Sequence, residues 1–221
     1  MQNPWLDLPL RAPYVLAGDK LSIDQHRHAN NEIRLNTLPE PYIGGLNNAE
    51  VIFLALNPGF RESDVTVNLT HPEFATVNRR NQSDPYNSTF YYFDGVFEER
   101  GGYWWWKKQL KPLLDAGVTE QDIRNKVMLI EYLPYHSETA GKISNLIVPS
   151  QQFTFELVRE AIRRNKLIIM MRSEKLWLKA VPELEGKYTM PHNKRNVIIS
   201  PGNMGQENFD TILYRLTNRG V

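Results

Sequence analysis

Four short runs of apolar residues along the chain each predict a buried β-strand. They cover residues 51–56, 127–132, 167–171 and 197–199. None of the runs has a polar face, which is typical of strands in a parallel sheet that is covered on both sides. Apolar positions at helical spacing predict helices over residues 102–116, 150–165, 173–180 and 207–217. Strands that alternate with helices predict an α/β fold with three layers, α/β/α, around a central, mostly parallel four-stranded sheet.

Two segments lack this pattern. Residues 1–49 contain five prolines and are predicted to form an extension packed on the domain, with one helix over residues 22–35 that Ser22 caps. Residues 61–88 are polar without a sustained period, which predicts a long loop, and such loops in compact domains often have a function. We expect residues 1–221 to form a single domain.

Composition excludes several classes of protein. The chain has 221 residues, of which 41% are hydrophobic and 23% charged, as in ordinary globular proteins. It has no apolar run of membrane-spanning length and no basic, apolar leader, so we expect a cytoplasmic, monomeric protein without membrane contact. The absence of cysteine excludes disulfides, thiolate zinc sites, cysteine nucleophiles and iron–sulfur clusters. With a net charge of +1, any contact with DNA must rest on a local basic patch.

Two loops of similar composition follow predicted strands. Asn57-Pro58-Gly59-Phe60 follows the first strand, and Ser200-Pro201-Gly202-Asn203 follows the fourth. Ligands of open α/β sheets bind in the crevice beyond the carboxyl ends of the strands, so both loops are candidates for one binding site. The alternative is that each is a strand-ending turn without a ligand.

The two loops resemble the two short motifs of the uracil-DNA glycosylase superfamily. The first motif of that family is a strand followed by Asp/Asn/Glu-Pro-Tyr/Gly, and its mismatch-specific branch carries Asn-Pro-Gly, which Asn57-Pro58-Gly59 matches. The second motif is a strand followed by Ser/His-Pro-Ser/Gly, and the elements between the motifs come in the family's order. The resemblance covers residues 50–221. It implies a base-excision DNA repair hydrolase without metal or organic cofactor, which cleaves the N-glycosidic bond of a flipped-out damaged or mismatched base.

The resemblance also implies roles for individual residues. Asn57 would orient the attacking water through its side-chain carbonyl, with Ser200 and Asn203 as the catalytic positions of the second motif. An amide cannot take up the proton of that water at neutral pH, so much of the rate must come from stabilising the leaving base. The base itself would contact Pro58, Gly59, Phe60, Phe90 and Tyr92, the aromatic residues by stacking. The DNA would contact Pro201, Gly202, Met204 and Gly205, with Met204 as an apolar wedge in the minor groove. Apart from the resemblance, Arg79 and Arg80 in the predicted long loop are candidate phosphate contacts because of their charge.

Two residues mark departures from the family. The histidine common in the second motif is absent, and His136, after the second strand, is the candidate to replace it as a donor to the leaving base. Glu131 stands where the family usually reads uracil with an asparagine. A carboxylate accepts hydrogen bonds but does not donate them, so a purine or an amino-bearing lesion is predicted to fit better than uracil, unless Glu131 is structural.

Other features leave two further functions open. Three consecutive tryptophans, residues 104–106, span about 200 degrees of a helix, so at least one must face the core and at least one should be partly exposed. The histidines show no spacing that favours a metal site. The alternatives to a glycosylase are a catalytically inactive member of the superfamily that binds nucleic acid or a nucleotide-like ligand, and a protein-interaction domain that uses the tryptophan-rich helix.

Overall fold

The structure is a computed structural model that describes residues 1–62, 65, 72–97 and 101–217. Its centre is a five-stranded sheet with the order β1-β3-β2-β4-β5. The strands are β1 (Tyr42–Ile43), β2 (Val51–Ala55), β3 (Val127–Glu131), β4 (Leu167–Met170) and β5 (Tyr188–Thr189). Only β1 runs antiparallel to its neighbour, and the others are parallel. The carboxyl ends of β2, β3 and β4 therefore meet at one edge.

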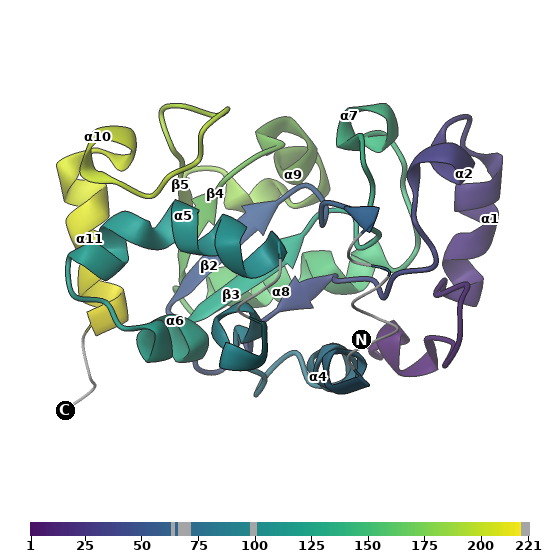
Figure 1. Cartoon of the computed structure of the whole chain (residues 1–221). Helices are drawn as coiled ribbons and strands as arrows, with labels where there is room; N and C mark the ends of the chain where they lie inside the picture. Colours follow the sequence, from purple (N-terminus) through teal and green to yellow (C-terminus); the bar gives the residue numbers. More distant parts are fainter. Residues whose placement is uncertain (63–64, 66–71, 98–100, 218–221) are drawn as a thin grey trace.

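Helices pack on both faces of this sheet (Figure 1). Ile52 and Leu54 of β2 belong to one apolar cluster, together with side chains of α8 (Gln151–Arg163) and α9 (Glu174–Ala180). The alternate β2 residues, Val51 and Phe53, belong to a second cluster with α5 (Gly101–Asp115) and α11 (Gln206–Thr217). This alternation follows from strand geometry, because successive side chains point to opposite faces.

The remaining elements are short, apart from the helices α1 and α4. They comprise α1 (Ala17–Gln25), α2 (Ala29–Glu32), α4 (Pro72–Ser83), α6 (Glu120–Lys126), α7 (Ala140–Ile143), α10 (Pro201–Met204) and the 3₁₀ helices Pro4–Asp7, Tyr91–Phe93, Gly95–Phe97 and Pro182–Leu184. None of the helices among the described residues combines the length and the apolar character needed to cross a membrane.

The prediction of a mixed α/β fold with a mostly parallel sheet is confirmed, but its count of four strands is wrong. Residues 197–199 are not a strand, and the last place in the sheet belongs to β5. The backbone N–H of Ile199 donates to the carbonyl of Gln109 on α5, and Val197 and Ile199 are buried in the second cluster. The apolar run therefore reflects burial of an irregular segment beneath a helix.

Two predictions for the other segments are also wrong. Residues 61–88 are not a continuous loop, because they contain α4. That helix lacks an apolar period because three of its buried side chains are amides, and each bonds elsewhere in the protein: Asn78, Asn81 and Gln82. The helix predicted over residues 22–35 is two short helices, and Ser22 lies inside α1 rather than at its start.

The amino-terminal segment packs on the domain and extends its sheet. Trp5, Leu8 and Leu16 are buried in the first apolar cluster, and β1 pairs with β3. Asp19 on α1 accepts hydrogen bonds from the hydroxyl of Tyr135 and from both the backbone N–H and the hydroxyl of Ser150. This buried carboxylate ties α1 to the segment after β3 and to the start of α8.

Candidate functional site: a cavity at the carboxyl ends of the strands

A cavity of about 360 Å³ lies at the carboxyl edge of the sheet. Its walls include residues 56–61 after β2, Glu131 at the end of β3 with residues 136–138, and Met171 and Arg172 after β4. Helix α5 covers one side with Gly102, Trp105 and Trp106. Its volume lies within the usual range for small-ligand sites, roughly 300–1,000 Å³. Parallel strands end here without helices over their ends, so polar groups of the loops can face the cavity.

Asn57 is held in one orientation by its side-chain nitrogen. Nδ2 donates to Ser137 Oγ at 2.8 Å, to the carbonyl of Tyr135 at 3.2 Å and to the carbonyl of Pro58 at 2.9 Å. Backbone carbonyls only accept hydrogen bonds, so the nitrogen rather than the oxygen must face them. Oδ1 has no partner among the described residues, and Asn57 lines the cavity. The amide therefore presents a free acceptor.

The loop that carries Asn57 is fastened to the segment after β3. The backbone N–H of Ser137 donates to the carbonyl of Pro58, and Gly59 forms a parallel bridge with Ser137. His136 Nδ1 lies 2.7 Å from the carbonyl of Gly59, so that nitrogen carries the hydrogen. Its Nε2 is buried 3.6 Å from Glu40 Oε2. The structure thus places His136 as a tie between this loop and Glu40, and not as a donor directed at a bound base.

Two buried carboxyl groups lie at the cavity, and their surroundings differ. Glu40 accepts a hydrogen bond from the hydroxyl of Tyr91 at 2.7 Å and another from that of Tyr92 at 2.6 Å. Gly102 allows this arrangement, because a Cβ there would clash with the ring of Tyr92. Glu131 is 4% exposed, and its buried Oε2 has no hydrogen-bond partner in the part of the chain that the structure describes.

The surroundings of Glu131 change its pKa. Burial raises the pKa of Glu131 well above its usual value, the negative charge of Glu40 raises it further, and Arg172 opposes the shift. This direction favours the protonated form of Glu131. A protonated carboxyl can both donate and accept a hydrogen bond. The expectation of a purine or an amino-bearing base assumed that Glu131 is a carboxylate. A protonated Glu131 no longer supports that expectation.

The rim of the cavity carries aromatic and cationic side chains. Phe60 lines it, and the guanidinium of Arg34 lies 5.4 Å from the centre of the Phe60 ring while pairing with Glu138. Arg172, just after β4, is exposed and has neither an ion pair nor a hydrogen bond within the described residues. Among the described residues, no three acidic or histidine side chains gather closely enough to hold a metal ion.

The cavity brings together most of the residues expected in the first loop and at the base. They are Asn57, Pro58, Gly59, Phe60, Tyr92, Glu131 and His136. Phe90 is fully buried in the second apolar cluster and does not line the cavity. Arg79 donates to the carbonyls of Leu8 and Pro9, so it holds the amino-terminal segment, and Arg80 is exposed on α4.

The second predicted loop lies outside the cavity. Ser200 caps α10, and the Asn203 side chain donates to the carbonyls of Asn196 and Ile198. Gly202 and Asn203 line a separate shallow depression beside residues 192–195, and Met204 is fully buried. Pro201 and Gly205 belong to the same short turn. Because the segment before Ser200 follows α5 at Gln109 rather than the sheet, the loop does not face Asn57.

The sequence interpretation overlooked three residues of the site: Glu40, Trp105 as a wall of the cavity, and Arg172. Arg172 directly follows a predicted strand, so the rule that singled out Asn57 would also have found it. Glu40 stands between two prolines and no local pattern indicates that it is buried.

No protein-family model, no curated protein and no solved structure matches the chain. The function of the site must be inferred from its own chemistry.

Proposed function

We propose that this protein is a DNA base-excision glycosylase, which hydrolyses the N-glycosidic bond of a damaged or mismatched base that has been flipped into the cavity. The observation that carries the proposal is the Asn57 amide, held by its nitrogen with its oxygen free at the wall of a base-sized, open cavity. Asn57 also belongs to the loop that resembles the first motif of the uracil-DNA glycosylase superfamily.

The amide acts on the attacking water. Oδ1 accepts a hydrogen bond from that water and directs its lone pair at the sugar carbon as the bond to the base breaks. Because Nδ2 is held by the carbonyl of Tyr135 and by Ser137, the amide is oriented before the substrate binds. The amide does not take up the proton of the water. That proton is released to solvent as the new carbon–oxygen bond forms, and the departing base anion takes up a proton after the bond to the sugar has broken. Because the base leaves as an anion, another group must stabilise it.

Glu131 supplies that stabilisation. In its protonated form it donates a hydrogen bond to the departing base, whose negative charge grows as the bond breaks. Burial raises the pKa of Glu131 well above its usual value, which favours this protonated form. It replaces His136 in this role, since the ring nitrogens of His136 are engaged with Gly59 and buried beside Glu40.

The proton on Glu131 also determines which edge of a base can form hydrogen bonds with this residue in the cavity. A neutral carboxyl group places one donor beside one acceptor, which complements a lactam edge, where an N–H stands next to a carbonyl. Uracil, hypoxanthine and xanthine all have such an edge. Uracil is therefore a substrate in this proposal, in contrast to the expectation from a carboxylate.

The test is excision from duplex and single-stranded oligonucleotides that carry uracil, hypoxanthine, xanthine or ethenocytosine. Wild-type protein should leave alkali-labile abasic sites at one or more lactam bases. Asn57→Ala should lower the single-turnover rate by about 10²–10³-fold, the usual effect of losing one oriented polar group in an active site. Asn125→Ala, an exposed asparagine on α6, is the matched control and should react like wild type. Absence of abasic product from wild-type protein on every substrate would contradict the proposal.

One observation favours a second candidate, a protein that binds a nucleotide-like ligand without cleaving it. The loop at residues 200–205, where the family carries its second catalytic motif, does not line the cavity. If this candidate holds, nucleosides will raise the melting temperature of wild-type protein while no base is released. Glu131→Leu should then weaken that stabilisation, because it removes both the donor and the acceptor, whereas Glu131→Gln, which keeps one donor beside one acceptor, should retain most of it.

A further inference from the structure

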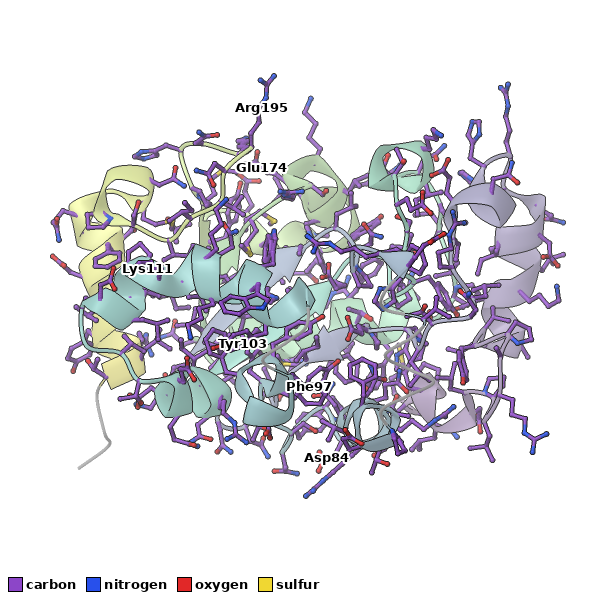
Figure 2. The ribbon with its side chains drawn as sticks, in the orientation of Figure 1. Asp84, Phe97, Tyr103, Lys111, Glu174 and Arg195 are labelled. Atoms are coloured by element: carbon purple, nitrogen blue, oxygen red, sulfur yellow. The ribbon has the colours of Figure 1, made fainter. Side chains whose placement is uncertain are left out.

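The tryptophan-rich turn of α5 forms part of the cavity rim. Trp105 lines the cavity and is 36% exposed, while Trp104 beside it is 60% exposed. Tyr103 and Trp106 on the same turn are each 3% exposed and pack in the second apolar cluster. Figure 2 shows Tyr103 on α5 in front of the sheet, with Lys111 further along the same helix. The buried pair fixes the turn and thereby holds the Trp105 indole at the cavity, while the exposed Trp104 indole is the next residue of the turn and lies outside the cavity lining.

Solvent-exposed indoles beside a binding cavity can stack on the rings of a ligand. Exposed aromatic rings stack on nucleobases, and such stacking tolerates any sequence because every base has a π-face. The rings of Trp105 and Trp106 already meet edge-to-face, with centroids 4.8 Å apart, so Trp106 supports the Trp105 indole from the core side. A base next to the one in the cavity would meet Trp105 first.

Two exposed cations of this region form no ion pair within the described residues, although the charge of Arg172 acts on the buried Glu131. Lys108 is exposed and lies one helical turn after Trp104 and Trp105, and Arg172 lines the same cavity. Neighbouring lysines are already neutralised, since Lys107 pairs with Glu120 and Lys111 with Asp115. The free positive charge of this region is thus concentrated beside the indoles, where it complements phosphate groups.

We infer that Trp104, Trp105, Lys108 and Arg172 form a platform that binds single-stranded DNA, with unpaired bases stacked on the indoles and phosphates on the two cations. The inference rests on the proposed function and narrows its substrate to a damaged base in single-stranded DNA, because a mismatched base exists only in a duplex. In a duplex the faces of the bases are covered by their neighbours, so an indole can stack only on an unpaired base. The apolar wedge expected to push a base out of a duplex, Met204, is fully buried and cannot do so.

The test is a binding titration by fluorescence anisotropy with a labelled, undamaged 12-nucleotide single strand and with the same sequence as a duplex. Wild-type protein should bind the single strand more tightly than the duplex. Trp105→Ala should weaken single-strand binding about tenfold, as expected for the loss of one stacked base, and Trp105→Phe should retain most of the affinity. Lys108→Ala should weaken it as well.

Matched controls come from surfaces away from the cavity. Tyr214→Ala removes an aromatic side chain that is 63% exposed on α11, and Lys111→Ala removes a paired lysine of the same helix. Both should bind like wild type. Circular dichroism melting of each variant separates loss of binding from loss of folding, and the Phe variant provides a folded comparison if Trp105→Ala melts early.

Several outcomes would overturn the inference: equal or tighter binding to the duplex, no binding to either form, or single-strand binding that Trp105→Ala leaves unchanged while that variant remains folded. Because the strand is undamaged, the result does not depend on excision. Strand binding without any excision would leave the platform intact and contradict the glycosylase. Excision together with equal binding to the single strand and the duplex would support the glycosylase and contradict the platform.

Discussion

Glu131 and Glu40 are two buried carboxyl groups whose neighbours assign them different properties. Glu40 has two tyrosine hydroxyls as donors, whereas the buried Oε2 of Glu131 has none. An unpaired buried charge is costly, so the group without donors keeps its proton instead. Glu131 thereby becomes a neutral group with a donor and an acceptor at the cavity.

The raised pKa of Glu131 makes the stability of the protein depend on pH. Between the unfolded and the folded pKa of this group, the unfolded state binds fewer protons than the folded state, so folding stability falls as pH rises. The contribution is fully present below the unfolded pKa, near 4.5, and is lost as pH rises through the folded pKa. Relative to Glu131→Gln, we expect wild type to lose about 1.4 kcal/mol of unfolding free energy per pH unit within this window.

Urea denaturation of both proteins at pH 5, 6, 7 and 8 measures this difference. The exposed Glu207→Gln on α11 is the matched control and should follow wild type at every pH. A constant difference between wild type and Glu131→Gln across the series would show that Glu131 is ionised in the folded protein.

At the scale of elements, α5 has two functions on two faces. Tyr103, Trp106, Leu110 and Leu113 fill the second apolar cluster, while the face with Trp104 and Trp105 stays open. Trp106 contacts Phe53 of β2, with ring centroids 5.3 Å apart, so the helix that borders the cavity is anchored to the strand that precedes Asn57. Packing of the buried face therefore sets the position of the rim.

Substitution of Trp106 and of Trp104 should separate the packing of the buried face from the role of the exposed face. Trp106→Ala is expected to lower the unfolding free energy by about 3–5 kcal/mol, because it leaves a large cavity in the core. Trp104→Ala, at an exposed position, should change it by no more than about 0.5 kcal/mol. Urea denaturation of both variants compares them directly, and similar losses would mean that the two side chains are buried alike.

At the scale of the whole molecule, charge is nearly balanced. The net charge is +1, and ion pairs occupy many of the lysine and arginine side chains, such as Arg163 with Glu156 and Glu160. Long-range attraction of DNA is correspondingly small, and binding must rest on local contacts. This property distinguishes a stacking platform from an extended basic groove.

The salt dependence of single-strand binding measures this property. If Lys108 and Arg172 each neutralise one phosphate, the logarithm of the binding constant should fall against the logarithm of salt concentration with a slope of about −1.4. Affinity should then drop about sevenfold between 50 and 200 mM salt. A slope steeper than about −3 would indicate that further cations contact the strand, in disagreement with the platform as defined.

The sequence by itself determined the elements that depend on local patterns. Contiguous apolar runs identified β2, β3 and β4, and helical periodicity identified α5, α8, α9 and α11. The predicted ends of these elements lie within two residues of the observed ends, because both signals are contained in neighbouring positions. Asn57 could be predicted for the same reason, since it directly follows a buried strand. The helix α4 could not, because its buried face consists largely of amides whose partners are far away in sequence.

Only the tertiary structure decided how these parts form a site. The run at residues 197–199 has the composition of a strand, yet it packs beneath α5, and this carries Ser200 and Asn203 away from Asn57. The pKa of Glu131 is raised first by its burial and then by the charge of Glu40, which folding brings in from the proline-rich amino-terminal segment. Burial and charge proximity are properties of residues distant in sequence, and no local pattern encodes them.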